Sequence, residues 1–271
     1  MKIDIISLFP EFFDAFFSHS IIKRAIEAGR LDMAVTNPRD FSHNKHGQVD
    51  DTPYGGGAGM LMMAPPIFEA VESAASNYDS AINGNYETDE ICDEMSLIGN
   101  PSESIRRRIV FMGPTGQPFT QEKARELATY DQLILVCGHY EGVDYRVEEH
   151  LVDETISIGD YVLTGGELPA MVVADAVARM IPGVLGAASG AQEDSFYEPL
   201  LECPQYTKPL EFRGWVVPDI LRSGHHKNIA TWRQKEALKR TRLLRPDLLE
   251  RPLTKEEIKL LKEIVEEESR L

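Results

Sequence analysis

Residues 133–170 read LILVCGHYEGVDYRVEEHLVDETISIGDYVLTGGELPA, and this stretch decides the fold class. Its apolar start, Leu133–Cys137, ends at Gly138, a pattern typical of a strand buried on both faces of a parallel sheet. A second short run, 155–158, ends at Gly159. Because strands and helical segments alternate from Lys2 onward, the sequence predicts an α/β domain with a parallel sheet.

Glycines cluster just beyond these predicted strands. Gly138 and Gly142 follow the first strand, Gly159 follows the second, and the pair 165–166 comes shortly after. Glycine lets a backbone approach a ligand closely, and ligands of open parallel sheets bind beyond the carboxyl ends of the strands. Ordinary turns are the alternative explanation, but such a concentration of glycine loops favours a ligand site.

The composition bounds the class of protein. The chain has 271 residues and a net charge of −16, a size that allows one large domain or two smaller ones. Its apolar runs are far shorter than the roughly 18–20 residues that cross a bilayer, and its start lacks the features of a signal peptide. Cys92, Cys137 and Cys203 are widely spaced, so we expect a reducing, cytoplasmic setting without disulfides. The adjacent His225 and His226 have no third ligand nearby, so no metal site is expected.

Two segments interrupt the alternation. Residues 75–104 are acidic and contain no Lys or Arg, a composition that predicts a mobile surface insertion. Residues 186–198 are rich in Gly, Ala and Ser and predict a flexible linker. The expected domains are therefore 1–185, an α/β domain, and 199–271, a mainly helical domain.

The C-terminal part is basic although the chain is acidic. Residues 204–251 contain 11 Lys or Arg against 5 Asp or Glu. A helix is predicted over 229–244, and this local excess of positive charge indicates a surface that follows nucleic-acid phosphates. A merely solvated helix face is the alternative. The candidate tRNA-binding residues are Arg233, Lys235, Lys239, Arg240 and Arg242.

Several motifs resemble one family, the bacterial tRNA (guanine-N1)-methyltransferases of the knotted SPOUT superfamily. These motifs lie in order along the chain: KIDIISLFPEFF at 2–13, CGHYEG at 137–142, SIGDYVLTGGELPA at 157–170, EDSF at 193–196, ECPQYT at 202–207, SGHH at 223–226 and RPDLLE at 245–250. The resemblance implies a deep C-terminal trefoil knot in the α/β domain, a homodimer, and S-adenosylmethionine as methyl donor. It further implies methylation of N1 of the guanine immediately 3′ of the tRNA anticodon.

The resemblance also assigns roles to residues. Asp194 would be the general base, Arg179 the cation that stabilises charge on the guanine, and any Mg²⁺ would bind without a dedicated protein cage. The glycine-rich loop 53–60 would lie beside the cofactor site. The residues implied to bind the methyl donor are Met112, Gly113, Pro114, Gly116, Gly138, Glu141, Ile158, Gly159, Asp160, Tyr161, Val162, Leu163, Gly165 and Gly166.

Three positions depart from the family pattern. Phe111 and Gly113 stand where many relatives have Tyr and Ser, which puts a side-chain hydrogen bond there in doubt. Glu202 stands where relatives usually have Asp. None of these departures touches Asp194 or Arg179.

Two other functions compete with this reading. A dinucleotide-dependent oxidoreductase would need a GxGxxG turn, which GPTG at 113–116 does not supply. A non-catalytic RNA-binding module would use the basic C-terminal part and leave the glycine loops unexplained.

Overall fold

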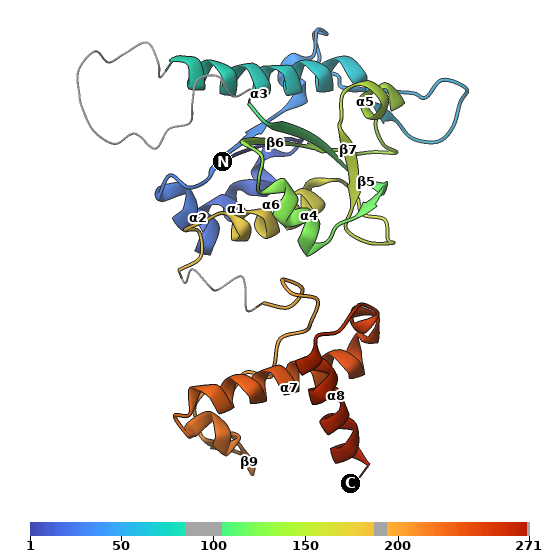
Figure 1. Cartoon of the computed structure of the whole chain (residues 1–271). Coiled ribbons are helices and arrows are strands. Elements are labelled where there is room, and N and C mark those ends of the chain that lie inside the picture. Colours follow the sequence, from blue (N-terminus) through green and yellow to red (C-terminus); the bar gives the residue numbers. More distant parts are fainter. Residues whose placement is uncertain (85–104, 187–193, 270–271) are drawn as a thin grey trace, which may run out of the picture. The chain divides into compact units, whose positions relative to one another are not determined.

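The computed structural model describes residues 1–84, 105–186 and 194–269. The chain divides into two compact units, Met1–Ala188 and Ser189–Leu271, and the boundary falls within the segment 186–198. Figure 1 shows the sheet and most helices in the first unit. No helix in the described ranges is long and apolar enough to cross a membrane.

The first unit is built on a five-stranded sheet in which every neighbouring pair of strands is parallel. The predicted α/β class with a parallel sheet is thereby confirmed. The strand order is β2-β1-β6-β5-β7, so β6 lies at the centre and is buried along its whole length. The strands are β1 (Lys2–Ile6), β2 (Asp32–Thr36), β5 (Arg107–Pro118), β6 (Gln132–Cys137) and β7 (Glu154–Ser157).

Helices cover both faces of this sheet (Figure 1). One face, with Leu133 and Leu135, packs on η1 (Pro10–Phe13), α1 (Asp14–Ser18), α2 (Ser20–Glu27), α4 (Gln121–Leu127) and α6 (Glu167–Met180). The other face, with Ile134 and Val136, packs on α3 (Ala64–Gly84) and α5 (Tyr145–His150), near η2 (Pro38–Phe41) and the short pair β3 (Asp50–Asp51) and β4 (Leu61–Met62). Because both faces are covered, the central strand carries apolar residues at consecutive positions.

The acidic insertion begins later than predicted. Residues 75–84 belong to α3, because Ala74 is buried and the helix continues past it. Arg107 anchors this part of the helix by donating to the Ala75 carbonyl at 3.0 Å and to the Asp79 carboxylate. Residues 75–84 of the predicted insertion are therefore helical, and the remainder, 85–104, lies outside the described residues.

The C-terminal unit is mainly helical. Its two long helices, α7 (His226–Leu244) and α8 (Lys255–Glu268), enclose a small core of Leu238, Leu260 and Ile264. Ile258 of α8 is 43% exposed, because Leu260 and Ile264 form the inner stripe of this helix. The shorter elements are β8 (Glu211–Phe212), β9 (Trp215–Val216), η3 (Asp219–Arg222) and η4 (Pro246–Leu249).

The start of α8 is held by charge and capping together. Thr254 and Glu257 form a reciprocal capping box. Arg251 donates two hydrogen bonds to the buried Glu257 carboxylate, at 2.6 and 3.2 Å. The Arg251 guanidinium lowers the pKa of Glu257 to about 2, so this carboxylate stays ionised and the cap stays closed throughout the neutral range.

The end of the expected linker is a hydrogen-bonded turn and not an open chain. The Phe196 amide donates to the Leu200 carbonyl at 3.0 Å, and the Glu202 amide donates to the Ser195 hydroxyl at 3.0 Å. The Leu201 amide donates to Thr241 on α7 at 2.9 Å. Asp194 therefore stands at the edge of a turn that is fixed to the C-terminal unit.

Candidate functional site

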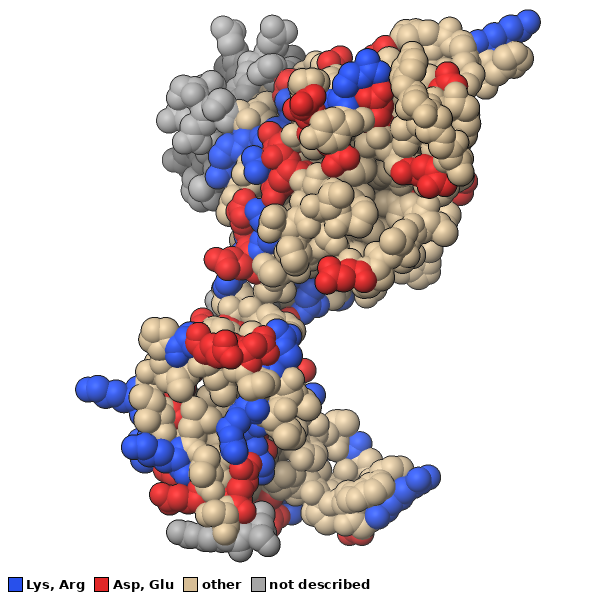
Figure 2. All heavy atoms as spheres, turned by 90° about the vertical axis from the view of Figure 1, so that its right-hand side faces the viewer, with Lys and Arg blue, Asp and Glu red and all other residues tan. Residues whose placement is uncertain are grey.

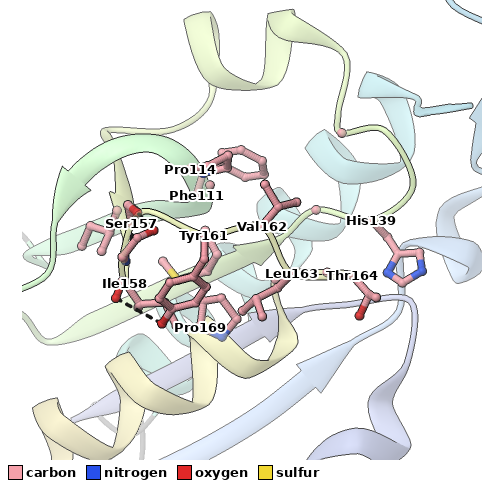
Figure 3. Close-up of a pocket in the computed structure, with 18 of the residues that line it drawn as sticks. Phe111, Pro114, His139, Ser157, Ile158, Tyr161, Val162, Leu163, Thr164 and Pro169 are labelled. Atoms are coloured by element: carbon pink, nitrogen blue, oxygen red, sulfur yellow. Dashed lines mark hydrogen bonds between the residues drawn. The ribbon is translucent and has the colours of Figure 1, made fainter. Parts of the chain in front are cut away.

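The main pocket of the first unit lies at the carboxyl ends of β5, β6 and β7, as the glycine pattern predicts. Figure 3 shows Tyr161, Ile158 and Pro169 at one end and His139 with Thr164 at the other. The residues that line it are Phe111, Met112, Gly113, Pro114, Gly138, His139, Tyr140, Glu141, Gly142, Ile156, Ser157, Ile158, Gly159, Tyr161, Val162, Leu163, Thr164, Gly165, Gly166 and Pro169.

The walls of the pocket come from loops that cross the sheet edge. The chain leaves β7, passes beyond the end of β5 and returns to β6, where the Gly166 amide donates to the Gly138 carbonyl at 2.8 Å. A Cβ on Gly166 would lie 2.7 Å from the Cα of Cys137. Only glycine therefore allows the start of α6 to pack this closely against the end of β6.

Most of the residues assigned to the methyl donor line this one pocket; Gly116 and Asp160 do not. Asp160 is exposed to solvent. A Cβ on Gly116 would lie 2.4 Å from the backbone carbon and oxygen of Thr155. Gly116 is therefore required for the close approach of β5 to β7, and the structure gives it a packing role.

The assignment by resemblance left out part of the lining. The additional residues share loops with the assigned ones: Phe111, His139, Tyr140, Gly142, Ile156, Ser157, Thr164 and Pro169. Proximity in sequence to Gly138 and Gly165 was the signal that could have found His139 and Thr164.

Phe111 and Gly113 are matched to each other. The ring of Phe111 is buried and lies against Gly138, where a Cβ would be 3.1 Å from the ring. A Cβ on Gly113 would lie 2.8 Å from the same ring. A side chain at position 113 would therefore displace the aromatic wall of the pocket, so the two departures from the family pattern form a compatible pair.

The pocket is poor in charge. Among the described residues that line it, none is Lys or Arg, and Glu141 is the one carboxylate. The Glu141 amide donates to the Met60 carbonyl at 3.1 Å, and Gly59 packs against the Glu141 side chain. The loop 53–60 thus contacts the pocket residue Glu141, but the loop itself does not line the pocket.

A buried polar pair, Ser7 and Glu167, lies at the start of α6. The Ser7 hydroxyl donates to Glu167 at 2.8 Å, and Glu167 is buried at the start of α6.

Burial raises the pKa of the Cys137 thiol well above its usual value, and the Glu167 carboxylate raises it further. Cys137 is therefore a neutral packing residue and not a nucleophile.

The two residues assigned to catalysis belong to different units. Arg179 lies half-buried near the end of α6 in the first unit, and Asp194 lies half-buried in the turn of the second. The Asp194 carbonyl accepts a hydrogen bond from the Tyr197 amide at 3.3 Å. This turn gives Asp194 a defined backbone position within its own unit.

The candidate tRNA-binding residues fall into two groups. Lys235 bonds Glu267 at 2.6 Å and Arg242 bonds Glu268 at 2.8 Å, so both join α7 to α8. Arg233, Lys239 and Arg240 are exposed, and Arg240 donates to the Glu202 carbonyl at 3.4 Å. Figure 2 shows Lys and Arg side chains projecting from several parts of this unit.

Metal-ligating side chains are dispersed in the part of the chain that the structure describes. There, no three His, Cys, Asp or Glu residues come together in a way that could hold an ion. The His225 amide donates to the Ser223 hydroxyl at 3.2 Å, at the start of α7.

A parallel sheet whose glycine loops form a pocket with few charged side chains, followed by a helical unit with a basic segment at 204–251, fits an α/β enzyme that acts on nucleic acid. The family model for tRNA (Guanine-1)-methyltransferase TrmD matches residues 1–251. The chain belongs to this family and is a tRNA-modifying methyltransferase.

Curated relatives cover nearly the whole chain. A tRNA (guanine-N(1)-)-methyltransferase from Desulforamulus reducens is 53% identical over 97% of this chain and 95% of its own length. Proteins of the same name from Halalkalibacterium halodurans and Brevibacillus brevis are 51% and 52% identical, over 97% and 98% of this chain and 98% and 99% of their own lengths.

Proposed function

We propose that this enzyme transfers a methyl group from S-adenosylmethionine to N1 of the guanine immediately 3′ of the anticodon in tRNA. The observation that carries this proposal is the pocket at the strand ends, which combines exposed loop backbone with an almost complete lack of charged side chains. Membership of the TrmD family supports the acceptor.

The pocket residues fit the donor better than they fit a dinucleotide. Backbone amides and carbonyls of the loops around Gly138 and Gly166 can recognise an adenine edge without a charged partner. Two phosphates would call for neutralising cations, whereas Glu141 is the one charged side chain among the described lining residues. A carboxylate suits a sulfonium cation, which supplies an electrophilic methyl group when the donor is bound.

Asp194 and Arg179 are the proposed catalytic pair. Guanine N1 carries a proton at neutral pH, so a base must accept that proton as the methyl group is attacked, and charge then builds on O6. Asp194 would accept the proton and Arg179 would stabilise O6. The resemblance also implies Mg²⁺, for which the sequence shows no dedicated protein cage.

We also propose a cytoplasmic homodimer with a trefoil knot in the first unit. An exposed apolar strip supports the dimer: Tyr161, Val162 and Leu163 border the pocket, and Leu168 and Val172 continue along α6. Exposed apolar side chains in one loop and at positions i and i+4 of the following helix suit a protein interface. The segment 158–166, which crosses beyond β5 to reach β6, is the part of the chain that the knot would involve.

The function is tested by methyl transfer to RNA. We expect labelled methyl groups from S-adenosylmethionine to appear as 1-methylguanosine in tRNA that has a guanine 3′ of its anticodon. A matched tRNA with adenine at that position should stay unlabelled. Methylation at another nucleoside would contradict the acceptor, and retention of NAD in place of the methyl donor would contradict the cofactor.

The exposed cations of α7 should carry part of the tRNA affinity. Replacing Lys239 and Arg240 with alanine should weaken tRNA binding and flatten the slope of log K against log salt by up to about two, because each phosphate contact releases counterions. Lys235→Ala is the matched comparison, since Lys235 is already paired with Glu263 and Glu267. If the slope is unchanged in the double variant, Lys239 and Arg240 make no phosphate contacts and are merely solvated.

A further inference from the structure

The β8–β9 hairpin carries an unusual turn. Glu211 pairs with Val216 and Phe212 pairs with Trp215. The two turn residues have positive φ, 56° at Arg213 and 85° at Gly214, as in the type I′ turn that short hairpins favour. Asn or Gly ordinarily occupies the first of these positions, so an arginine there is held in a strained conformation.

Two aromatic side chains beside this turn are exposed to solvent. Phe212 is 56% exposed and Trp215 is 70% exposed. Their ring centroids are 6.3 Å apart, and the Arg213 guanidinium lies 5.2 Å from the centre of the Phe212 ring. Two rings and a guanidinium therefore form one exposed surface at the tip of the hairpin.

The surface is not explained by packing within its own unit. The small core of this unit consists of residues from α7 and α8 with Leu200, Leu249 and Leu261 at its edge, and it includes no residue of the hairpin. The Val217 amide donates to the Leu210 carbonyl at 3.0 Å and closes the base of the hairpin. Tyr206, just before it, lies 6.4 Å from the ring of Trp232 on α7. The hairpin is thus anchored at its base, while its tip remains exposed.

The charge around the hairpin is positive. Arg213 is joined by Lys208, Arg222 and Lys227 in the flanking segments, against Glu211 and Asp219. Of these, Arg222 pairs with Asp219 at 3.4 Å. Exposed aromatic rings interleaved with cations are the pattern that stacks on unpaired bases and holds their phosphates.

We propose that the β8–β9 hairpin is a stacking platform for unpaired bases of the RNA substrate. The Trp215 and Phe212 rings would stack on bases, and Arg213 would add a phosphate contact or a second stacking plane. The proposal rests on tRNA as the substrate, and it assigns base contacts to residues outside α7. A double-stranded stem could not use these rings, because its bases are already stacked.

Paired substitutions at Trp215 separate stacking from apolar packing. Trp215→Leu keeps apolar area but removes the aromatic face, and it should weaken binding of an anticodon stem-loop RNA on the order of 10-fold or more. Trp215→Phe should recover most of that loss. Leu243→Ala, at an exposed apolar residue of α7, should change nothing. Equal affinity of the Leu and Phe variants would overturn stacking.

Arg213→Asn tests the turn independently. Asparagine suits the type I′ position, so the hairpin should remain folded, while loss of the cation should reduce the salt slope of RNA binding by about one. Unchanged affinity and slope would overturn the role of Arg213.

Fluorescence identifies the occupant directly. The chain has two tryptophans, so Trp232→Phe leaves Trp215 as the reporter. Stem-loop RNA should quench its emission, and a fully paired duplex of equal length should quench it less. A change that depends on protein concentration without RNA would instead indicate that a second copy of the chain covers the hairpin, and would overturn the proposal. Failure of the parent enzyme to bind any tRNA would count against the proposed function itself.

Discussion

Replacing Asp194 with asparagine is expected to lower turnover about 10²–10⁴-fold and to leave binding of S-adenosylmethionine nearly unchanged. The amide keeps the shape of the carboxylate but cannot accept the guanine N1 proton. The donor pocket lies in the other unit, so its affinity should not depend on this side chain. Single-turnover methylation and calorimetric titration of the donor measure the two effects separately.

Glu198→Gln provides the matched control for this experiment. Glu198 is an exposed acid in the same turn, and its neutralisation should leave turnover within a few-fold of the parent. If Asp194→Asn also retains nearly full turnover, the base must be another group. A pH profile that keeps its acidic limb in the asparagine variant would point to the same conclusion.

The proposed dimer predicts complementation between two inactive chains. One chain would carry Asp194→Asn and the other Gly165→Trp, which fills the donor pocket. If each active site takes Asp194 from one chain and its pocket from the other, mixed dimers should regain one working site of two. No recovery, with exchange of subunits verified by mass spectrometry, would indicate sites built within single chains.

Gly116→Ala is expected to destabilise the first unit by about 1–3 kcal/mol or more. The added Cβ would lie 2.4 Å from the Thr155 carbonyl and 2.5 Å from the Ile156 amide. Both are backbone atoms of β7, so the contact can be relieved only by moving the strands apart. The urea midpoint should fall, and the change in donor affinity should follow from the unfolded fraction.

Gly186→Ala is the control for the backbone effect of the substitution, because nothing lies within 4 Å of a Cβ there. Its urea midpoint should match that of the parent. A Gly116→Ala protein of normal stability with reduced donor affinity would restore Gly116 as a ligand contact. That result would reject the packing role that the geometry assigns.

The sequence by itself was sufficient to predict the parallel sheet and the position of the pocket. A strand with apolar residues at every position, as in 133–137, can be buried only when both faces are covered. Glycines beyond successive strand ends lie along one edge of a parallel sheet, so the pocket could be placed before any coordinate was known. The cap of α4 is also a local feature: the Thr120 hydroxyl accepts from the Lys123 amide three residues later.

Composition predicts local structure less well where contacts between distant parts of the sequence determine that structure. Residues 75–84 follow the acidic composition of the predicted insertion only in part, and they continue α3, where Arg107 on a distant strand binds Ala75 and Asp79. Likewise, charge alone could not separate Lys235 from Lys239. Only the approach of α8 turns Lys235 into a bridge between helices and leaves Lys239 exposed.

The tertiary structure alone decided what each glycine does. In sequence, Gly116 and Gly166 are both small residues that the resemblance assigns to the methyl donor. In space, Gly166 stands in the pocket wall against β6, whereas Gly116 faces the backbone of β7. The physical reason is that glycine has no side chain whose chemistry could indicate a role. The role of each glycine depends on which atoms the fold places where a Cβ would be.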